Sequence, residues 1–211
     1  MIDPTAKIYP GVQIGRGATI GEFALIGVPA RGEQPGSVAT IIGDDCVIRS
    51  HSVLYSGNVI GHRFQTGHHA MIREANEIGD DVSIGSLTVV EHHIRIGNGA
   101  RIHSRAFIAE YSTIAEQAWL GPGVNLLNAR FPASPTTKRH LVGATIGAAA
   151  RLGGSVTVLS GVTIGANALI GAGALVTRDI APSKLAFGHP AAEIRDIQEL
   201  RYDDDNEPPY R

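Results

Sequence analysis

Residues 78–96 read IGDDVSIGSLTVVEHHIRI, and this stretch returns an aliphatic residue at every sixth position. The same spacing runs from Ile42 to Leu126, and only Thr66 breaks the aliphatic series. The residue two positions before each of these is usually small or of modest size, as Cys46 is. A period of six matches neither the 3.6 residues of a helical turn nor the alternation of one long strand. It is typical of very short strands joined by turns, which predicts a parallel β-helix.

In the left-handed version of this fold three hexads make one triangular coil, so residues eighteen apart should lie one above another, about 4.8 Å apart. Two columns of corners then begin with glycine, which can adopt the backbone angles that a tight corner needs. These glycines are Gly61, Gly79 and Gly97 in one column and Gly67, Gly85 and Gly121 in the other. The third column has no glycine there and instead carries Tyr55, Arg73, Glu91, Ala109 and Leu127. That corner is therefore expected to have another role.

The composition is that of one soluble globular domain, with 43% hydrophobic and 18% charged residues among 211. The 26 glycines and the 5% of aromatic residues suit a repetitive β structure. A net charge of -2 gives no electrostatic reason to expect nucleic acid or an anionic membrane as a partner. The sequence has no signal-like N-terminus and no apolar run long enough to cross a membrane. We therefore expect a cytoplasmic protein.

Two interruptions of the period divide the repeat. The first hexads run from Ile2 to Ile26, and the pattern then breaks at residues 28–40, VPARGEQPGSVAT, whose Pro and Gly content predicts a surface loop. It breaks again at residues 129–144 and resumes from Ile146 to Val176, which gives 26 hexads in all, or eight to nine coils. We therefore expect an all-β, left-handed parallel β-helix over residues 1–180 with two loop insertions.

The remaining residues, 181–211, lose the pattern and are expected to form a C-terminal loop, a short helix and an acidic tail. Ile194, Ile197 and Leu200 have helical spacing and follow a proline that could begin a helix. A helix over residues 191–202 would cover the open end of the solenoid, which otherwise leaves an unpaired strand edge. The final DDDNEPPYR is expected to be solvated.

The corner without glycine carries a polar series at intervals of eighteen, and both loops leave the solenoid at this corner. The series is Ser56, Glu74, His92, Glu110 and Asn128, and we call it the corner ladder. Functional residues concentrate on loops held by a rigid scaffold, and a histidine between two carboxylates suits general-base work. The alternative is a solvated ladder of polar groups at a turn.

The other histidines and the single cysteine give weaker signals. His51 and His69 are also eighteen apart, but no spacing matches a known zinc pattern such as paired cysteines or H-E-x-x-H, so no metal is expected. Cys46 lies at an inward position of the repeat and is expected to be a buried small hydrophobic residue.

The 26 hexads resemble the left-handed β-helix acyltransferases of the hexapeptide-repeat superfamily, over residues 2 to about 195. Residues 89–97, VVEHHIRIG, look like the V-E-H-D-x-x-I-G of bacterial sugar N-acetyltransferases and the H-D-C-T-V-G of the lipid A UDP-GlcNAc acyltransferases. In both, the first histidine of the motif is the catalytic base, which implies that role for His92. The chain has His93 where those motifs have aspartate, so Glu110 or Glu74 is expected to orient the base instead.

Two further segments extend the resemblance. Residues 110–128, EYSTIAEQAWLGPGVNLLN, resemble a run of the UDP-amino-sugar N-acetyltransferases whose last asparagine contacts the acceptor, which implies that role for Asn128. Arg73 and Arg130, at the same corner and in the second loop, are candidates for the same substrate. Residues 188–191, GHPA, are similar to a G-N-P-A segment that lies near coenzyme A in the family.

The resemblance implies an acetyl-CoA-dependent N- or O-acetyltransferase that acts on a sugar, probably nucleotide-linked, by direct transfer in a ternary complex. It also implies a homotrimer with sites between chains and coenzyme A near the later coils. The residues expected to contact coenzyme A are Gly147, Gly153, Lys184, Gly188 and Arg195, with Lys184 and Arg195 binding its phosphates. Two alternatives remain open: a hexapeptide-repeat carbonic anhydrase with three histidine ligands shared between subunits, and a non-catalytic scaffold.

Overall fold

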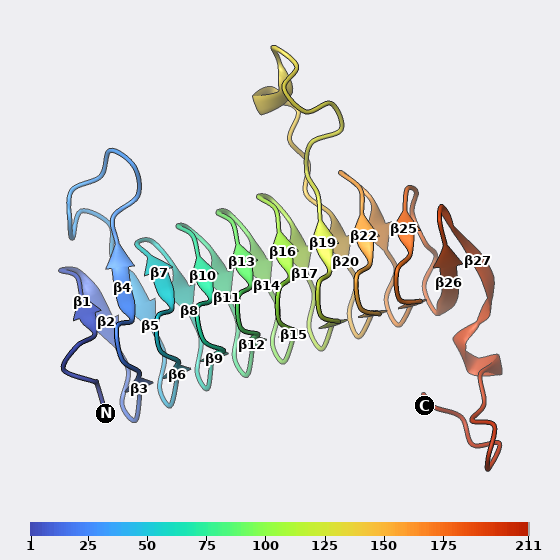
Figure 1. Ribbon diagram of the computed structural model, residues 1–211, viewed down its shortest axis with the longest axis horizontal. Helices are drawn as coiled ribbons and strands as arrows, with labels where there is room; N and C mark the ends of the chain where they lie inside the picture. Colours follow the sequence, from blue (N-terminus) through green and yellow to red (C-terminus); the bar gives the residue numbers. More distant parts are fainter. Residues whose placement is uncertain (211) are drawn as a thin grey trace.

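The computed structural model describes residues 1–210 and winds them into a β-solenoid whose three parallel sheets form the faces of a triangular prism (Figure 1). Face A contains β3 Thr19–Ile20, β6 Val47–Ile48, β9 Gln65–Thr66, β12 Ser83–Ile84, β15 Arg101–Ile102, β18 Trp119–Leu120, β21 Arg151–Leu152, β24 Leu169–Ile170, β26 Lys184–Gly188 and β27 Ala191–Asp196. Face B contains β1 Lys7–Ile8, β4 Leu25–Val28, β7 Val53–Tyr55, β10 Met71–Ile72, β13 Val89–Val90, β16 Phe107–Ile108, β19 Asn125–Leu126, β22 Thr157–Val158 and β25 Leu175–Val176.

Face C contains β2 Val12–Ile14, β5 Thr40–Ile42, β8 Val59–Ile60, β11 Glu77–Ile78, β14 Arg95–Ile96, β17 Thr113–Ile114, β20 Thr145–Ile146 and β23 Thr163–Ile164. The only helical segments in residues 1–210 are the short 3-10 turns η1 Thr137–Arg139 and η2 Ile197–Glu199. Within the same residues, no helix is long and apolar enough to cross a membrane.

Strands of successive coils pair in the register that the repeat predicts. Met71 pairs with Val89 and Ile72 with Val90, each eighteen residues further along the chain. The aliphatic residue of each hexad points inward, so that one continuous core fills the prism from Ile20 to Ala191. The predicted left-handed parallel β-helix is confirmed.

Thr66, the exception in the aliphatic series, has a hydrogen-bonding reason to be there. Its side-chain hydroxyl accepts the backbone N–H of Arg49 at 2.9 Å and lies 3.2 Å from the hydroxyl of Ser52. Both polar groups are buried, so each needs a partner inside the prism. The same coil places Phe64, a large ring that is 0% exposed, two positions earlier, where other coils have small residues. The large and the small residue have exchanged places within this coil.

The corner glycines are needed for a reason other than the predicted one. Gly61 and Gly79 do not adopt a positive φ. A Cβ at Gly61 would instead lie 2.7 Å from the backbone of Gly79 in the next coil, which is too close for any side chain. The positive φ falls two residues later in the corner, as at Arg63 with φ 55° and Asp81 with φ 59°. Stacking of one corner on the next therefore selects glycine, while the left-handed backbone is carried by its neighbour.

Both loops leave the prism at the corner between faces B and C, as predicted. The first connects β4 to β5, and the second, which contains η1, connects β19 to β20. Figure 1 shows the two loops projecting from the same edge of the solenoid, the second further than the first. They lie on either side of the coils that carry His92 and Glu110.

The C-terminal end differs from the prediction in two respects. The solenoid continues for two further hexads, because Ile180 bridges to Ile164 and Ala186 pairs with Ile170 after a corner shortened by two residues. The helix predicted over residues 191–202 is wrong. Residues Ala191–Asp196 form β27 instead, which pairs antiparallel with β26. The last solenoid strand offers a row of unpaired backbone groups, and pairing with them outweighs the weak helical spacing of three apolar residues.

Candidate functional site

The corner ladder stands on the corner between faces B and C, where each of its residues follows a face-B strand by one or two positions. Its side chains are drawn close by the stacking of the coils, since the strands that precede them pair in direct register. Ser56 is only 4% exposed and Asn128 9% exposed. The five positions predicted to form one polar column do so.

His92, Glu110 and Asn128 form a connected chain within the corner ladder. The Nε2 atom of His92 lies 3.5 Å from Oε1 of Glu110. The side-chain amide of Asn128 donates a hydrogen bond to the other carboxylate oxygen, Oε2. About a quarter of each of the His92 and Glu110 side chains is exposed, so the pair is reachable yet largely removed from water. Glu110 is thus the carboxylate that faces the imidazole.

His93, which stands where the family motif has aspartate, lies against His92. Nδ1 of His93 lies 2.8 Å from Nδ1 of His92, and the two rings meet edge to face at 84°. Tyr111 packs against both rings, with centroids 5.9 Å from His92 and 5.7 Å from His93. Because Nε2 of His92 faces a carboxylate and carries the proton there, Nδ1 of His92 accepts the N–H of His93. The lone pair of His92 therefore points at His93, and a ligand would have to displace that ring to reach it.

Arg73 and Glu74 form an ion pair with each other. They do not take the positions predicted for them, Glu74 beside His92 and Arg73 at the substrate. Arg73 donates two hydrogen bonds to Glu74, at 2.9 and 3.0 Å, and a third at 3.3 Å to Glu91. Its guanidinium also lies 5.0 Å from the ring centre of Tyr55. Burial, the largest single influence, raises the pKa of Glu74, but the hydrogen bonds from Arg73, a backbone hydrogen bond and the nearby positive charge together lower it below its ordinary value. With two carboxylates on one guanidinium, Arg73 has little capacity left for a substrate anion.

Two buried asparagines fix the backbone of this corner from inside. Asn76 accepts the backbone N–H of Ile94 at 2.7 Å, directly after the two histidines, and donates to the carbonyl of Arg73 at 2.8 Å. Asn58 makes the matching contacts one coil earlier, including one to the N–H of Asn76. Both side chains are 0% exposed, so nothing in water could replace these bonds. Their role was not predicted, since an inward asparagine looks like an ordinary turn residue in the sequence.

Cavities lie on both sides of the His92 corner. One of about 560 Å³ is enclosed by the second loop and the base of the corner, where Ser160 donates to the carbonyl of Asn128 at 2.9 Å. Arg130 lines it, with its guanidinium 5.5 Å from the ring centre of Phe131. A second cavity, of about 330 Å³, opens on face C beside His93 and Tyr111. Both have the size of a small-molecule site.

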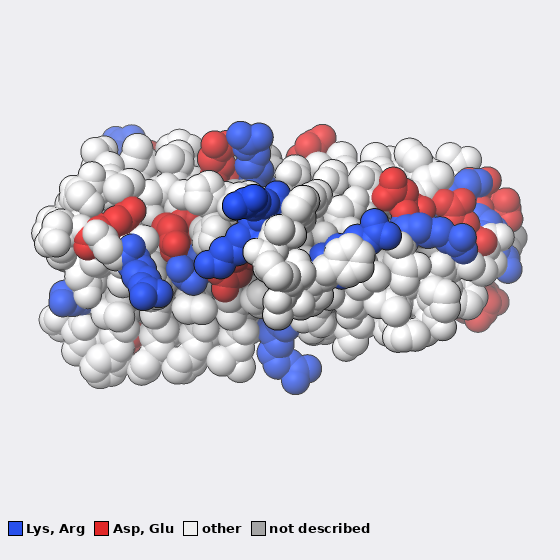
Figure 2. Space-filling view, turned by 90° about the horizontal axis from the view of Figure 1, so that it is seen from above, with Lys and Arg blue, Asp and Glu red and all other residues white. Residues whose placement is uncertain are grey.

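The second loop brings positive charge to this side of the molecule. It contains Arg130, Lys138 and Arg139, and these residues and the loop backbone extend away from the prism. Seen from the side of the loops, Lys and Arg side chains gather near the middle of the solenoid, where this loop projects (Figure 2). A phosphorylated ligand bound under the loop would meet this charge.

The residues predicted to contact coenzyme A lie elsewhere. Gly147 is on the corner between faces C and A and Gly153 on the corner between faces A and B, so neither shares the corner of the ladder. A Cβ would lie 2.5 Å from the backbone of Ala166 at Gly147, and 2.6 Å from that of Ala172 at Gly153. The packing of the coils alone therefore accounts for both glycines.

Lys184, Gly188 and Arg195 belong to the terminal hairpin of β26 and β27. Lys184 forms an ion pair of 2.9 Å with Asp196 across the hairpin, and the hydrogen bond from this pair raises the pKa of the lysine. Arg195 is exposed, and GHPA forms the turn of the hairpin. One chain does not bring this group together with the corner ladder.

Neither Cys46 nor Ser56, the two nucleophiles considered, lies beside His92. Cys46 is 1% exposed in the core, as predicted, and burial raises the pKa of its thiol. Ser56 donates its hydroxyl at 2.8 Å to Glu33 of the first loop, two coils from His92. Residues 1–210 of a single chain also bring together no three His, Cys, Asp or Glu side chains that could hold a metal ion.

Comparison with known proteins relates the six-residue repeat to a known family. The model of the family described as bacterial transferase hexapeptide (six repeats) matches residues 77–110 and 143–178. These two segments, about a third of the chain, match the bacterial transferase hexapeptide family. The first matched segment contains His92 and Glu110, and the second contains Gly147 and Gly153. The resemblance noted from the sequence is therefore confirmed at the level of the family.

Two kinds of curated relative match parts of this chain. An acyl-[acyl-carrier-protein]--UDP-N-acetylglucosamine O-acyltransferase of Campylobacter concisus is 28% identical over 104 residues, which is 49% of this chain and 38% of that protein. The bifunctional protein GlmU of Acidithiobacillus ferrooxidans is 35% identical over 133 residues, 61% of this chain and 28% of that protein. The matches thus span well under half the length of these relatives.

Among solved structures, the UDP-N-acetylglucosamine O-acyltransferase of Moraxella catarrhalis superimposes with a TM-score of 0.77 at 23% identity. The alignment covers 94% of this hexapeptide chain and 75% of that one. The enzyme of the same name from Bacteroides fragilis gives 0.76 at 19% identity. At these identities the likeness shows that the solenoid is shared.

Proposed function

We propose that this hexapeptide-repeat protein transfers an acetyl group from acetyl-CoA to an amino or hydroxyl group of a nucleotide-linked sugar. The observation that carries the proposal is the chain of contacts from Asn128 through Glu110 to His92, on the one corner that both loops flank. The name of the Campylobacter relative supports acyl transfer to a nucleotide-linked sugar, since it states a UDP-sugar acceptor, with an acyl-carrier protein as that enzyme's donor.

In this proposal His92 is the general base. The acceptor replaces His93 at Nδ1 of His92 and gives up its proton there as its oxygen or nitrogen attacks the thioester carbonyl. Glu110 stabilises the imidazolium that forms, and backbone N–H groups stabilise the oxyanion. When the carbon–sulfur bond breaks, the imidazolium returns the proton to the leaving thiolate. The acetyl group is then on the acceptor, and the free thiol of coenzyme A is the second product.

Direct transfer in a ternary complex fits this corner better than a covalent intermediate does. Cys46 lies in the core and Ser56 is bound to Glu33, so neither can accept the acetyl group near His92. The two cavities beside the corner offer separate places for acceptor and donor, one under the second loop and one on face C. Holding both reactants at once supplies most of the advantage of such a reaction.

A homotrimer would complete the donor site. Face B carries a row of half-buried apolar side chains that adjoins the ladder corner. It runs through Leu25, Val53, Met71, Val89 and Phe107, and after Asn125 and Thr157 it ends with Leu175. We propose that this row contacts a second subunit. Gly147, Gly153, Lys184, Gly188 and Arg195 of the neighbour would then bind coenzyme A across the cleft from the ladder, and light scattering should give three times the mass of a chain.

The activity is tested by measuring the free thiol released from acetyl-CoA with a panel of amino sugars and nucleotide-linked sugars. We expect release that depends on both substrates and an acetylated sugar detectable by mass spectrometry. The matched control omits the acceptor, because hydrolysis of the thioester would also release thiol. Equal release with and without every acceptor of the panel would contradict the proposal.

Glu110→Gln should lower kcat about tenfold or more, whereas Glu74→Gln should leave kcat within about threefold. A charge-assisted hydrogen bond to the imidazolium is worth about 1.5–3 kcal/mol, and about 1.4 kcal/mol corresponds to a tenfold change in rate. Glu74 is occupied by Arg73, so its removal costs an ion pair and no contact to His92. Steady-state measurement of kcat in the two variants shows which carboxylate orients His92. A larger loss of kcat in Glu74→Gln than in Glu110→Gln would assign that role to Glu74.

A further inference from the structure

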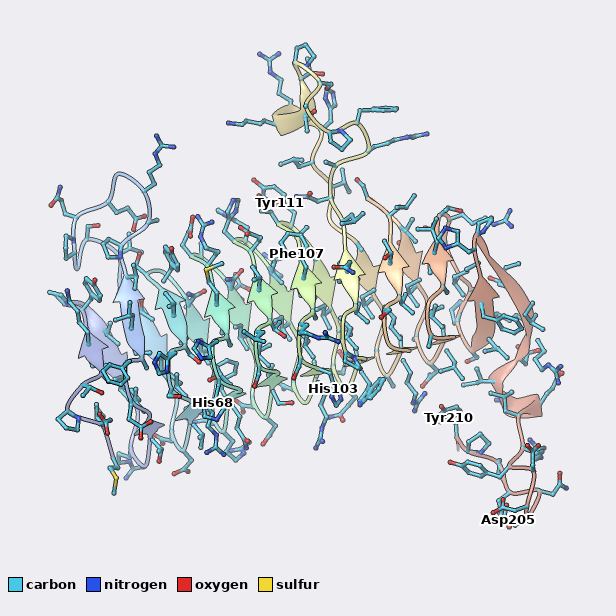
Figure 3. The ribbon with its side chains drawn as sticks, in the orientation of Figure 1. His68, His103, Phe107, Tyr111, Asp205 and Tyr210 are labelled. Atoms are coloured by element: carbon cyan, nitrogen blue, oxygen red, sulfur yellow. The ribbon has the colours of Figure 1, made fainter. Side chains whose placement is uncertain are left out.

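Face A carries a row of cationic and aromatic side chains on the side of the prism opposite the corner ladder. Arg101 of β15, Trp119 of β18 and Arg151 of β21 pair in direct register, so their outward side chains alternate along three adjacent strands. Figure 3 shows Tyr111, beside the ladder, at the edge of the loops, whereas His103 and Tyr210 lie on the other side of the solenoid. Nothing in the proposed reaction uses this row.

A cavity of about 430 Å³ lies over the row, and we call it the face-A pocket. It is lined by Arg101, Gln117, Trp119, Arg151, Leu169 and Tyr210. Trp119 is 36% exposed, and its ring lies 4.6 Å from that of His103, which holds it in place. The pocket thus offers one supported aromatic face with a guanidinium on each side.

The charge of the face-A pocket is unbalanced. Arg63, Arg73 and Arg95 each form an ion pair with a carboxylate, but within residues 1–210 neither Arg101 nor Arg151 does. One guanidinium nitrogen of Arg151, Nη1, is buried and has no hydrogen-bond partner among the described residues. A buried polar group without a partner is costly, and guanidinium binds phosphate oxygens in pairs. The missing partner is therefore an anion.

The C-terminal tail places an aromatic ring in the rest of the face-A pocket. The tail was predicted to be solvated, and Asp203, Asp204 and Asp205 are indeed exposed. Beyond them, however, the chain turns back to face A and places the ring of Tyr210 4.1 Å from the guanidinium of Arg151. An aromatic ring thus occupies the side of the pocket next to Arg151, which leaves the ring of Trp119 and Arg101 open to a ligand.

We propose that the face-A pocket binds a nucleotide, with the base stacked on the ring of Trp119 and the phosphate on Arg101 and Arg151, and that Tyr210 holds the aromatic place when no nucleotide is bound. Stacking on tryptophan and pairing of phosphate with arginine are the contacts that such a ligand needs. The nucleotide can be a uridine diphosphate or an adenosine bisphosphate group, since both present a ring beside phosphate. This site is separate from the one proposed for catalysis.

Trp119 makes the test direct, because it is the single tryptophan of the sequence. The full chain is titrated with uridine diphosphate and with adenosine 3′,5′-bisphosphate while the tryptophan fluorescence is followed, and calorimetry confirms each affinity. We expect saturable quenching by at least one of them. The two arms distinguish the sources, and binding is read without turnover, so failure here is independent of the proposed reaction. No saturable binding of either nucleotide would overturn the proposal.

Variants then locate the site. Arg151→Gln and Arg101→Gln should each weaken binding about tenfold, whereas Arg31→Gln, an exposed arginine of the first loop, should leave it unchanged. Tyr210→Ala should tighten binding, since the ligand no longer displaces the ring. An equal loss in Arg31→Gln, unchanged affinity in Tyr210→Ala, or equally tight binding of pyrophosphate would each contradict the proposal. Circular dichroism checks that the variants fold.

Discussion

His92→Ala is expected to lower turnover by at least about 100-fold while the assembly stays intact. A lost general base costs about 100- to 10,000-fold in rate, and no other group of the corner has a free lone pair at the same place. His93 is closest, but its Nδ1 is the atom that faces His92. The rate is measured as thiol release at saturating acetyl-CoA and acceptor, and light scattering of the same sample shows whether the subunits remain together.

His69→Ala is the matched control for this experiment. His69 is a histidine at another corner of the solenoid, and its ring stacks on His51 at 4.7 Å, away from the corner ladder. It should keep the full rate. A rate of His92→Ala near that of the unaltered protein at about pH 7 would contradict the assignment of His92 as the base. That result is expected if an amine acceptor binds already neutral, because no base is then needed.

The repeat was predictable from the sequence because one rule acts at every coil. Each inward residue, such as Ile78 or Ile96, meets the same kind of neighbour above and below, so its period survives in the sequence. The terminal hairpin has no such repetition. Ile194, Ile197 and Leu200 satisfy a helical spacing, and only the open edge of β24 and β26 in three dimensions selects a strand. Local pattern fails where a single tertiary contact decides.

The candidate site was likewise predictable only in part. The interval of eighteen placed His92, Glu110 and Asn128 in one column, because strand pairing fixes which residues stack. It could not choose between Glu74 and Glu110, since that choice depends on side-chain direction and on the capture of Glu74 by Arg73. The face-A pocket could not be predicted for another reason: it forms only because Tyr210 returns to β15, β18 and β21, and no repeat in the sequence signals that contact.

Phe64→Ala should cost about 3–5 kcal/mol in the free energy of unfolding, the range for a fully buried phenylalanine. Its ring is 0% exposed and lies in the coil where Thr66 replaces the usual aliphatic residue, so no neighbouring side chain is large enough to fill the space. The coil is internal, and β9 pairs with strands on both sides. The solenoid cannot avoid the cost by fraying at one end, as a terminal coil could.

Denaturant unfolding followed by circular dichroism measures the loss, with Phe131→Ala as the matched control. Phe131 is 67% exposed in the second loop, and its removal should change the free energy by less than about 0.5 kcal/mol. Equal changes in the two variants would mean that Phe64 does not support the core. A large loss of unfolding free energy confined to Phe64→Ala would instead show that the ring of Phe64 stabilises this coil. It would support the view that Thr66 is tolerated because of the ring two positions before it.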